Sequence, residues 1–403
     1  MPGEVGASPV NLLVETLGDK IRQQGGDSRM VGVSFKDRAA ILPAGRAANG
    51  AYWWSTNSNS WVTSTFYIRT LPDWVKEINH SRPYMRGFGA QWFGLDAKEG
   101  DAPFCTMVAG DDKIRYCASL MATPWGNEMI EEFAERALTA EQLGHHSGTD
   151  LLTVSFSSND AVGHAVGPDA PEVRDISRRT DMLLGKLLDA VDREAGLSNV
   201  TLVLTADHGV APMAPVQGQT VYNPTGGRLS AGLLTNAVQD ALNAKFGEGD
   251  WVEANTGTML VLRRETANKC KADWAQVEEV AAEAARKFPH IARVYTDAEF
   301  QKAPGANEDE IEKAMRRSYY HGRSPDLMIL PDEYYNFDAS NAVHGTPYEY
   351  DTQCPSSSFG VGVRHGRYAE AVAPNDIAPT LSDIIGVAAP KNAVGHVIRE
   401  IRQ

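Results

Sequence analysis

The chain has 403 residues, of which 42% are hydrophobic and 22% charged, the composition of an ordinary globular protein. It carries 38 Lys and Arg residues against 52 Asp and Glu, which gives a formal net charge of −14. This balance argues against a general nucleic-acid-binding protein, which needs a broad basic face. No apolar run reaches the roughly 18 residues that a membrane span requires. From the charge we therefore expect no nucleic-acid partner, and from the apolar runs no membrane partner.

In chain order, the first expected elements are a helix over Leu12–Ile21 and a strand over Met30–Ser34. Residues 49–86 are rich in Trp and Tyr, and we interpret them as an aromatic cap insertion. Four cysteines are too few for a disulfide scaffold, although Cys105 and Cys117, 12 positions apart, could form one bridge.

The next strong pattern is a strand, a helix and a strand in succession. Asp150–Phe156 and Val200–Leu204 are apolar runs of strand length, and Val173–Glu194 between them has helical spacing. This order predicts a βαβ unit in a parallel sheet with a right-handed crossover. Functional groups of such sheets gather just beyond the carboxyl ends of the strands.

The remaining segments complete the expected architecture. Residues 215–322 are interpreted as a second insertion, after which Asp326–Leu330 is expected to resume the sheet and Ile377–Ile385 to form a helix. We therefore predict an α/β fold with a mostly parallel central sheet and helices on both faces. Its core would comprise residues 1–48, 87–214 and 323–403.

Two pairs of Asp and His residues follow the predicted strands. They are Asp160 with His164 and Asp207 with His208, and a further histidine, His344, stands in a polar loop. Carboxylates and imidazoles are ligands that zinc accepts, and Gly209 would let the backbone turn away from such a site. Each element alone also fits a simpler interpretation: a capping Asp beside a surface His, or Asp160 as an N-cap or Asx turn. Their joint occurrence favours a metal site.

The sequence resembles the alkaline phosphatase superfamily, and within it the bacterial monomeric phosphate-irrepressible alkaline phosphatases. The segments that carry the resemblance run through nearly the whole chain: Ser34–Gly45, Asn49–Trp53, Trp61–Thr65, Asp160–His164, Thr205–Gly209, His344–Gly345 and Ala378–Leu381. The resemblance implies two zinc ions as cofactors. Asp160, His164 and His344 would hold one ion, and Asp207 and His208 would contribute to the other. Two metal ions suit phosphoryl transfer, because they act on both the attacking and the leaving oxygen.

The resemblance assigns Lys36 and Arg38 to the phosphoryl oxygens of the substrate. Residues two apart in an extended segment project from the same face, so both cations can point at one site. The alternative is that Lys36-Asp37-Arg38 is a solvated charged turn. An ammonium and a guanidinium together can bind the oxygens of a phosphate monoester dianion.

In the family, the nucleophile is a Thr or Ser at a helix N-terminus that precedes the segment matching Lys36. An Asp ligand of the second zinc and a phosphoryl-binding Asn also precede it. Thr16 is expected inside the Leu12–Ile21 helix, where its hydroxyl is not placed for attack. We therefore expect a truncated phosphatase whose activity is impaired or absent, with a stable non-catalytic descendant as the competing explanation. Loss of a central strand would leave an open sheet edge, so we also expect poor stability.

The function that the sequence predicts is metal-dependent hydrolysis of phosphate monoesters. A phosphodiesterase or nucleotide pyrophosphatase of the same superfamily and a zinc-binding pseudoenzyme are the alternatives. The expected partner is a small phosphate-ester substrate, and the resembled branch is monomeric. Its members also imply a periplasmic or secreted location if an N-terminal signal was lost.

Overall fold

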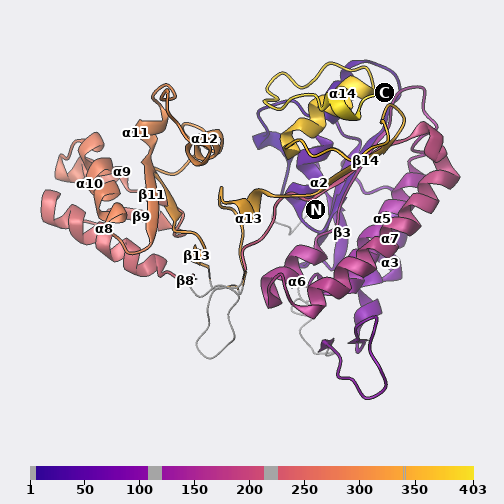
Figure 1. Ribbon diagram of the computed structural model, residues 1–403, viewed down its shortest axis with the longest axis horizontal. Helices are drawn as coiled ribbons and strands as arrows, with labels where there is room; N and C mark the ends of the chain where they lie inside the picture. The colour runs from indigo at the N-terminus through magenta and orange to yellow at the C-terminus, as the bar shows by residue number, and fades with distance from the viewer. Residues whose placement is uncertain (1–5, 108–119, 213–225, 339, 341) are drawn as a thin grey trace. The chain divides into compact units, whose positions relative to one another are not determined.

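A computed structural model describes residues 6–107, 120–212, 226–338, 340 and 342–403. The chain divides into two compact units (Figure 1). Unit 1 comprises Met1–Asp207 and Pro355–Gln403, and unit 2 comprises His208–Cys354. No helix among the described residues is both long and apolar enough to cross a membrane. Cys117, the expected partner of Cys105, lies outside the described residues.

The main sheet of unit 1 has four strands in the order β3-β2-β1-β6. The central pairs β1–β2 and β1–β6 are parallel, and β2–β3 is an antiparallel hairpin. The sheet is therefore mixed, and the α/β prediction is confirmed. The strands of unit 1 are β1 (Met30–Ser34), β2 (Gly50–Ser55), β3 (Ser60–Thr63), β4 (Gln91–Trp92), β5 (Cys105–Thr106), β6 (Leu151–Ser155), β7 (Thr201–Thr205) and β14 (Ser356–Gly360).

Helices cover both faces of this sheet, and the alternation of side chains along β2 shows how. Tyr52 and Trp54 lie in a core with Phe133 of α5, whereas Ala51 packs with Ile41 of α2 on the other face. Since both faces are covered, all five residues of β1 are buried. Gly32 in β1 allows α2 to approach closely, because a Cβ atom there would lie 2.1 Å from the Ala40 carbonyl oxygen.

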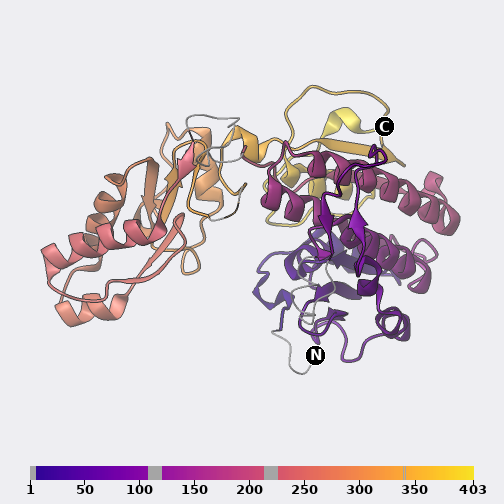
Figure 2. The ribbon, with the colours of Figure 1, turned by 90° about the horizontal axis from the view of Figure 1, so that it is seen from below.

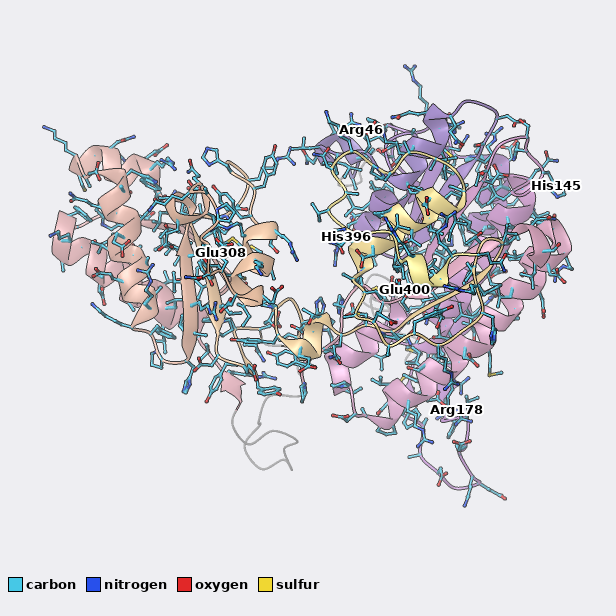
Figure 3. The ribbon with its side chains drawn as sticks, turned by 45° about the horizontal axis from the view of Figure 1, so that its top comes forward. Arg46, His145, Arg178, Glu308, His396 and Glu400 are labelled. Carbon is cyan, nitrogen blue, oxygen red and sulfur yellow. The ribbon has the colours of Figure 1, made fainter. Side chains whose placement is uncertain are left out.

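The helices of unit 1 are α1 (Leu17–Gln23), α2 (Asp37–Ala44), α3 (Asp73–Ser81), α5 (Pro124–Ala140), α6 (Ser158–Val166), α7 (Pro171–Ala195) and α14 (Ile377–Ile384). The strand and helix predictions for β1, β6, α7 and α14 are confirmed within a few residues. The first helix differs, because it begins only at Leu17. Thr16 is its N-cap in a capping box with Asp19, so the expectation that Thr16 lies inside a helix is wrong. Arg46, labelled in Figure 3, holds the segment before α1 in place. Its guanidinium donates to the Leu12 carbonyl at 3.0 Å.

The aromatic stretch 49–86 is not a separate cap, because it supplies β2 and β3 to the main sheet. Its rings are core residues: Trp61 is fully buried and lies 4.2 Å from Phe133 between ring centroids. The predicted β6-α7-β7 order is present. However, among the described residues β7 pairs with β14 in an antiparallel ladder and not with β6.

Unit 2 is built on an antiparallel sheet in the order β11-β12-β10-β9, with helices α8 and α10 packed on it (Figure 2). Its strands are β8 (Gly227–Arg228), β9 (Val252–Asn255), β10 (Met259–Leu262), β11 (Ile291–Thr296), β12 (Leu327–Pro331) and β13 (Tyr335–Asn336). Its helices are α8 (Ala231–Phe246), α9 (Arg264–Cys270), α10 (Trp274–Arg286), α11 (Asp297–Phe300), α12 (Glu310–Arg317) and α13 (Glu349–Thr352). The segment Asp326–Leu330, expected in the central sheet, forms most of β12 here, because β10 and β11 pair with it on its two sides.

Candidate metal centre

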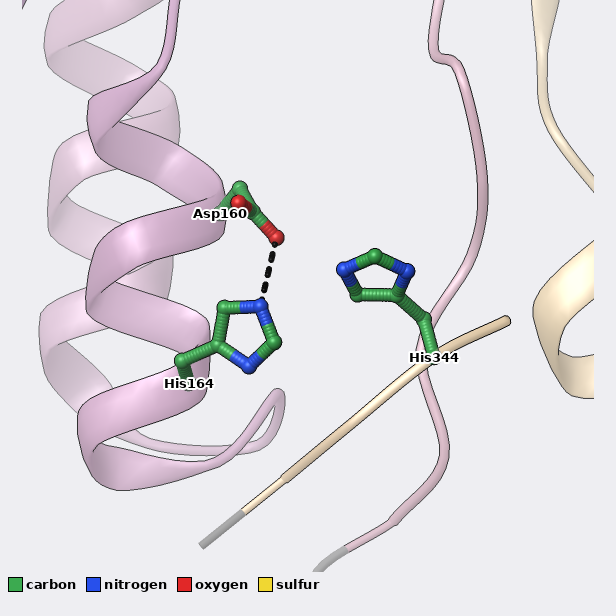
Figure 4. Close-up of side chains that lie close together, drawn as sticks. All are labelled: Asp160, His164 and His344. Atoms are coloured by element: carbon green, nitrogen blue, oxygen red, sulfur yellow. Dashed lines mark ion pairs between the residues drawn. The ribbon is translucent and has the colours of Figure 1, made fainter. Parts of the chain in front are cut away.

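Helix α6 presents Asp160 and His164 on one face. Strand β6 ends at Ser155 and α6 begins at Ser158, which puts Asp160 in the first turn and His164 one turn later. Residues four apart are neighbours on a helix surface. Asp160 Oδ1 lies 3.2 Å from His164 Nε2 (Figure 4). Asp160 is therefore part of the helix itself and not an N-cap, which is Ser157.

Lys36 reaches the same carboxylate from the loop after β1. Its Nζ forms an ion pair with Asp160 Oδ2, and both side chains are about four-fifths buried. The loop is fixed by Ser34, whose hydroxyl lies 3.1 Å from the Ser157 hydroxyl and accepts a bond from the Lys36 amide. Lys36 is thus not a solvated charge.

Arg38 does not share the extended segment expected for it. Helix α2 begins at Asp37, so Lys36 is extended backbone and Arg38 is already helical. The cause is local, because Asp37 accepts a bond from the Arg38 amide in the first turn, where an acidic residue is favourable. The same-face argument for Lys36 and Arg38 is therefore wrong, and the side chain of Arg38 is exposed.

Asp207 and His208 follow β7 directly, and the backbone after them is held close to α13. A Cβ atom on Gly209 would lie 2.1 Å from the Tyr350 carbonyl oxygen, and the Gly209 amide donates to the Asp351 carbonyl at 2.7 Å. Gly209 is thus needed for close approach. His208 Nδ1 lies 2.8 Å from the Gly209 carbonyl oxygen, to which it donates. That bond leaves Nε2 as the lone-pair nitrogen, the arrangement that metal-binding histidines share.

His344 lies against His208 within unit 2. The two rings stack with centroids 3.4 Å apart and planes 12° apart. The chain turns away immediately after His344 at Gly345, whose φ of 108° is one that glycine adopts freely. Both imidazoles therefore come from short loops and not from a helix or strand.

Asp351 supports these loops, a role that no motif in the sequence indicates. Asp351 is 3% exposed, and its carboxylate accepts bonds from the amide and hydroxyl of Thr346, at 2.8 and 2.6 Å. Burial raises the pKa of this carboxyl above its ordinary value. Only the turn-like sequence around it, His-Gly-Thr-Pro followed by aromatic residues, hinted at a structured loop.

Asp160, His164 and His344 can be tested as a ligand set for a metal ion. Asp160 and His164 supply an adjacent carboxylate and imidazole from unit 1, and His344 belongs to unit 2 (Figure 4). One carboxylate and two imidazoles are a donor set that zinc accepts.

Comparison with known proteins supports the family resemblance of the sequence. Residues 27–353 match the model of the type I phosphodiesterase / nucleotide pyrophosphatase family. The chain belongs to this family. It is 32% identical to the alkaline phosphatase PhoV of Synechococcus elongatus over 98% of this chain and 74% of that protein. It is 27% identical to the alkaline phosphatase PafA of Elizabethkingia meningoseptica over 98% of this chain and 75% of PafA.

The fold agrees with these similarities. A crystal structure of wild-type PafA superposes with a TM-score of 0.86 at 27% identity, covering 98% of this chain and 79% of PafA. A mutant of PafA, substituted at one Thr, one Asn, one Lys and one Arg, gives a TM-score of 0.84 at 26% identity. The chain is therefore a member of the alkaline phosphatase superfamily, whose enzymes hydrolyse phosphate esters with divalent metal ions.

Proposed function

We propose that this chain acts on phosphate monoesters at a two-zinc centre. The observation that carries the proposal is the adjacent pair of Asp160 and His164 on α6, in a chain whose relatives include alkaline phosphatases. Asp160, His164 and His344 would hold one ion, and Asp207 and His208 would contribute to a second. The ions would supply Lewis-acid stabilisation of the attacking and leaving oxygens of the phosphoryl group.

His208 and Lys36 provide support that does not depend on the comparisons. His208 is already held in the tautomer that a metal ligand needs, through its bond to the Gly209 carbonyl. Lys36 places a partly buried ammonium directly beside Asp160. A cation in that position would bind a phosphoryl oxygen and balance charge that the carboxylate ligands bring to the site.

Arg38 is proposed as the second phosphoryl-binding cation. The PafA mutant carries substitutions of a lysine and an arginine two positions apart, the spacing of Lys36 and Arg38. Because Arg38 lies in the first turn of α2 with an exposed side chain, its long guanidinium arm has freedom to reach a substrate. Arg38 would then position the phosphoryl group without being fixed beforehand.

Turnover by residues 1–403 is proposed to be low. Thr16 is the one threonine between residues 6 and 35, and it stands at a helix N-terminus, where the family has its nucleophile. Its hydroxyl is hydrogen-bonded to Asp19. Gly45 packs closely against this hydroxyl, because a Cβ atom at Gly45 would lie 2.0 Å from the Thr16 hydroxyl oxygen. Thr16 is thus a structural cap, so we assign it no catalytic role.

A phosphodiesterase activity is the second candidate, because the matching family model is named for diesters and pyrophosphates. The charge of the site favours the monoester. A monoester dianion carries one more charge than a diester and would gain more from Lys36 and Arg38 together.

The test has two parts, both measured by calorimetry. The first is zinc binding by the metal-free chain, and the second is binding of phenyl phosphate and of diphenyl phosphate by the zinc-loaded chain. We expect zinc uptake and tighter binding of phenyl phosphate, with slow or no hydrolysis of 4-nitrophenyl phosphate. Preference for the diester would favour the second candidate. Absence of zinc uptake would overturn the proposed function.

A further inference from the structure

Asn127 is buried in α5 directly behind the start of α6. It is 1% exposed, and its amide uses every hydrogen-bonding group it has. Nδ2 donates to Asn159 Oδ1 at 2.7 Å and to Thr180 Oγ1 at 2.9 Å. Oδ1 accepts a bond from the Ser158 amide at 3.1 Å. One side chain therefore joins three helices: α5, α6 and α7.

The bond to Ser158 replaces a cap that α6 does not make for itself. The first amides of a helix have no partner within it, and a side chain of the N-cap residue normally accepts from one of them. Ser157 makes no such bond, and its hydroxyl instead lies against the Ser34 hydroxyl. Ser158 is fully buried, so water cannot replace the missing partner.

Asn159 is held from the same point. Its side-chain oxygen, Oδ1, accepts a bond from Asn127 and lies 3.0 Å from the Thr180 hydroxyl. That hydroxyl also lies 2.8 Å from the Ile176 carbonyl oxygen in α7. The two residues that immediately precede Asp160 are thus fixed by the neighbouring helices. A helix whose first turn is fixed has a set rotation about its axis, and that rotation decides where Asp160 and His164 point.

We propose that Asn127 is a positioning residue for Asp160 and His164. This inference rests on the proposed function, in which these two side chains hold a metal ion. An amide is required because the site needs two donors and one acceptor in one planar group. An aspartate would keep the acceptor for Ser158 but would place a carboxylate oxygen against the Asn159 oxygen.

Asn79 offers a matched control in the same unit. It lies in α3 and bridges the backbone of Trp61, accepting from its amide at 2.7 Å and donating to its carbonyl at 2.9 Å. Replacing it with Ala removes an asparagine with two side-chain hydrogen bonds to backbone, without touching α6. Its loss should lower the stability of unit 1 and leave the metal site intact.

The experiment compares the wild type with Asn127→Ala, Asn127→Asp and Asn79→Ala in the full chain. Zinc affinity is measured by competition with a chromophoric chelator, and the exchange of α6 amides is measured by hydrogen–deuterium exchange of the zinc-free protein. We expect both Asn127 variants to lose about tenfold in zinc affinity, the effect typical of groups that orient metal ligands. We expect faster exchange of α6 amides in both variants, largest at Ser158 in Asn127→Ala, which removes its acceptor, and neither change in Asn79→Ala.

Equal zinc affinity and equal α6 exchange in the Asn127 variants and Asn79→Ala would overturn the inference. If Asn127→Ala does not fold, Thr180→Val removes the outer partner of the same amide and must show both effects in smaller size. A wild-type chain that binds no zinc overturns the proposed function. In that case, unchanged α6 exchange in Asn127→Asp overturns the positioning role as well, whereas faster exchange supports it.

Discussion

The candidate site draws its side chains from two kinds of structure, and the contrast is instructive. Asp160 and His164 stand one turn apart on α6, whose start is fixed by the neutral amide of Asn127. His208 and His344 stand on short loops, fixed by the close approach of Gly209 to Tyr350 and by the buried carboxylate of Asp351. Regular spacing sets the first pair, whereas contacts between distant parts of the sequence set the second.

The largest effect should come from removing a ligand on the helix. His164→Ala takes one imidazole from the proposed ion and should lower zinc affinity about 100-fold or more, since even indirect supports of metal ligands contribute 10–100-fold. Chelator competition measures this loss. His145→Ala is the control, because His145 is an exposed histidine of the same unit, whose Nε2 lies 3.8 Å from the Glu194 carboxylate. Equal losses in the two variants would show that His164 is not a ligand.

Two glycine substitutions compare how tightly the backbone is packed in the loop after β7 and in helix α6. Gly209→Ala places a methyl group 2.1 Å from the Tyr350 carbonyl, so the backbone must shift, at a cost of about 1–3 kcal/mol. Gly163→Ala adds a methyl group to α6 where, outside its own helix backbone and chain neighbours, no atom of the described residues lies within 4 Å, and should stabilise the protein by about 0.5–1 kcal/mol. Urea unfolding measures both. Stabilisation by Gly209→Ala would refute the close approach.

Lys36→Met tests the cation beside the helix pair while keeping the apolar stem of the side chain. A charged hydrogen bond to a phosphoryl oxygen contributes about 1.5–3 kcal/mol, so affinity for phenyl phosphate should fall about tenfold or more. Lys20→Met is the control, because Lys20 also forms an ion pair, with Glu15 at 2.6 Å. If both variants bind phenyl phosphate like the wild type, Lys36 has no role in the substrate site.

The smallest effect concerns acid titration away from the site. Burial raises the pKa of Glu278 in α10. The hydrogen bond from Trp274 and the charge of Arg264 oppose the shift, and the carboxylates of Asp326 and Asp297 add to it. The folded state then holds this proton to higher pH than the unfolded state, whose pKa is near 4.5. Stability should therefore fall as pH rises from about 4.5 through the folded pKa and level off above it.

Glu278→Gln should reduce that slope by the contribution of one carboxyl, whereas Asn127→Gln, which changes no charge, should leave it in place. Urea unfolding between pH 4 and pH 8 measures the difference. A slope unchanged by Glu278→Gln would show that Glu278 does not titrate in this range.

The sequence predicts the regular elements of this molecule better than the contacts between distant parts of the chain. Apolar runs and helical spacing identified β1, β6, α7 and α14, because these elements bury continuous or periodic faces. The prediction of a cap over residues 49–86 is wrong for the hairpin β2–β3, whose Trp- and Tyr-rich strands flank a polar turn, which is a hairpin signal. Large aromatic side chains suggested a surface insertion, but they fill the core against α5.

Within the candidate site, ligand-type residues could be named from their chemistry, but their supports could not. Asn127 lies 31 positions before Ser158, and Asp351 lies 142 positions after Gly209, so no local pattern links them. The orientation of Arg38 was also missed, because it depends on whether the helix begins before or after Asp37. Such details depend on tertiary packing, which short-range spacing does not encode.

The most direct test is anomalous X-ray scattering at the zinc edge from crystals of the zinc-loaded chain. We predict one strong peak about 2.0–2.2 Å from nitrogen or oxygen atoms of Asp160, His164 and His344, and a second beside Asp207 and His208. Zinc bound elsewhere, or a peak that touches only one of these side chains, would contradict the account.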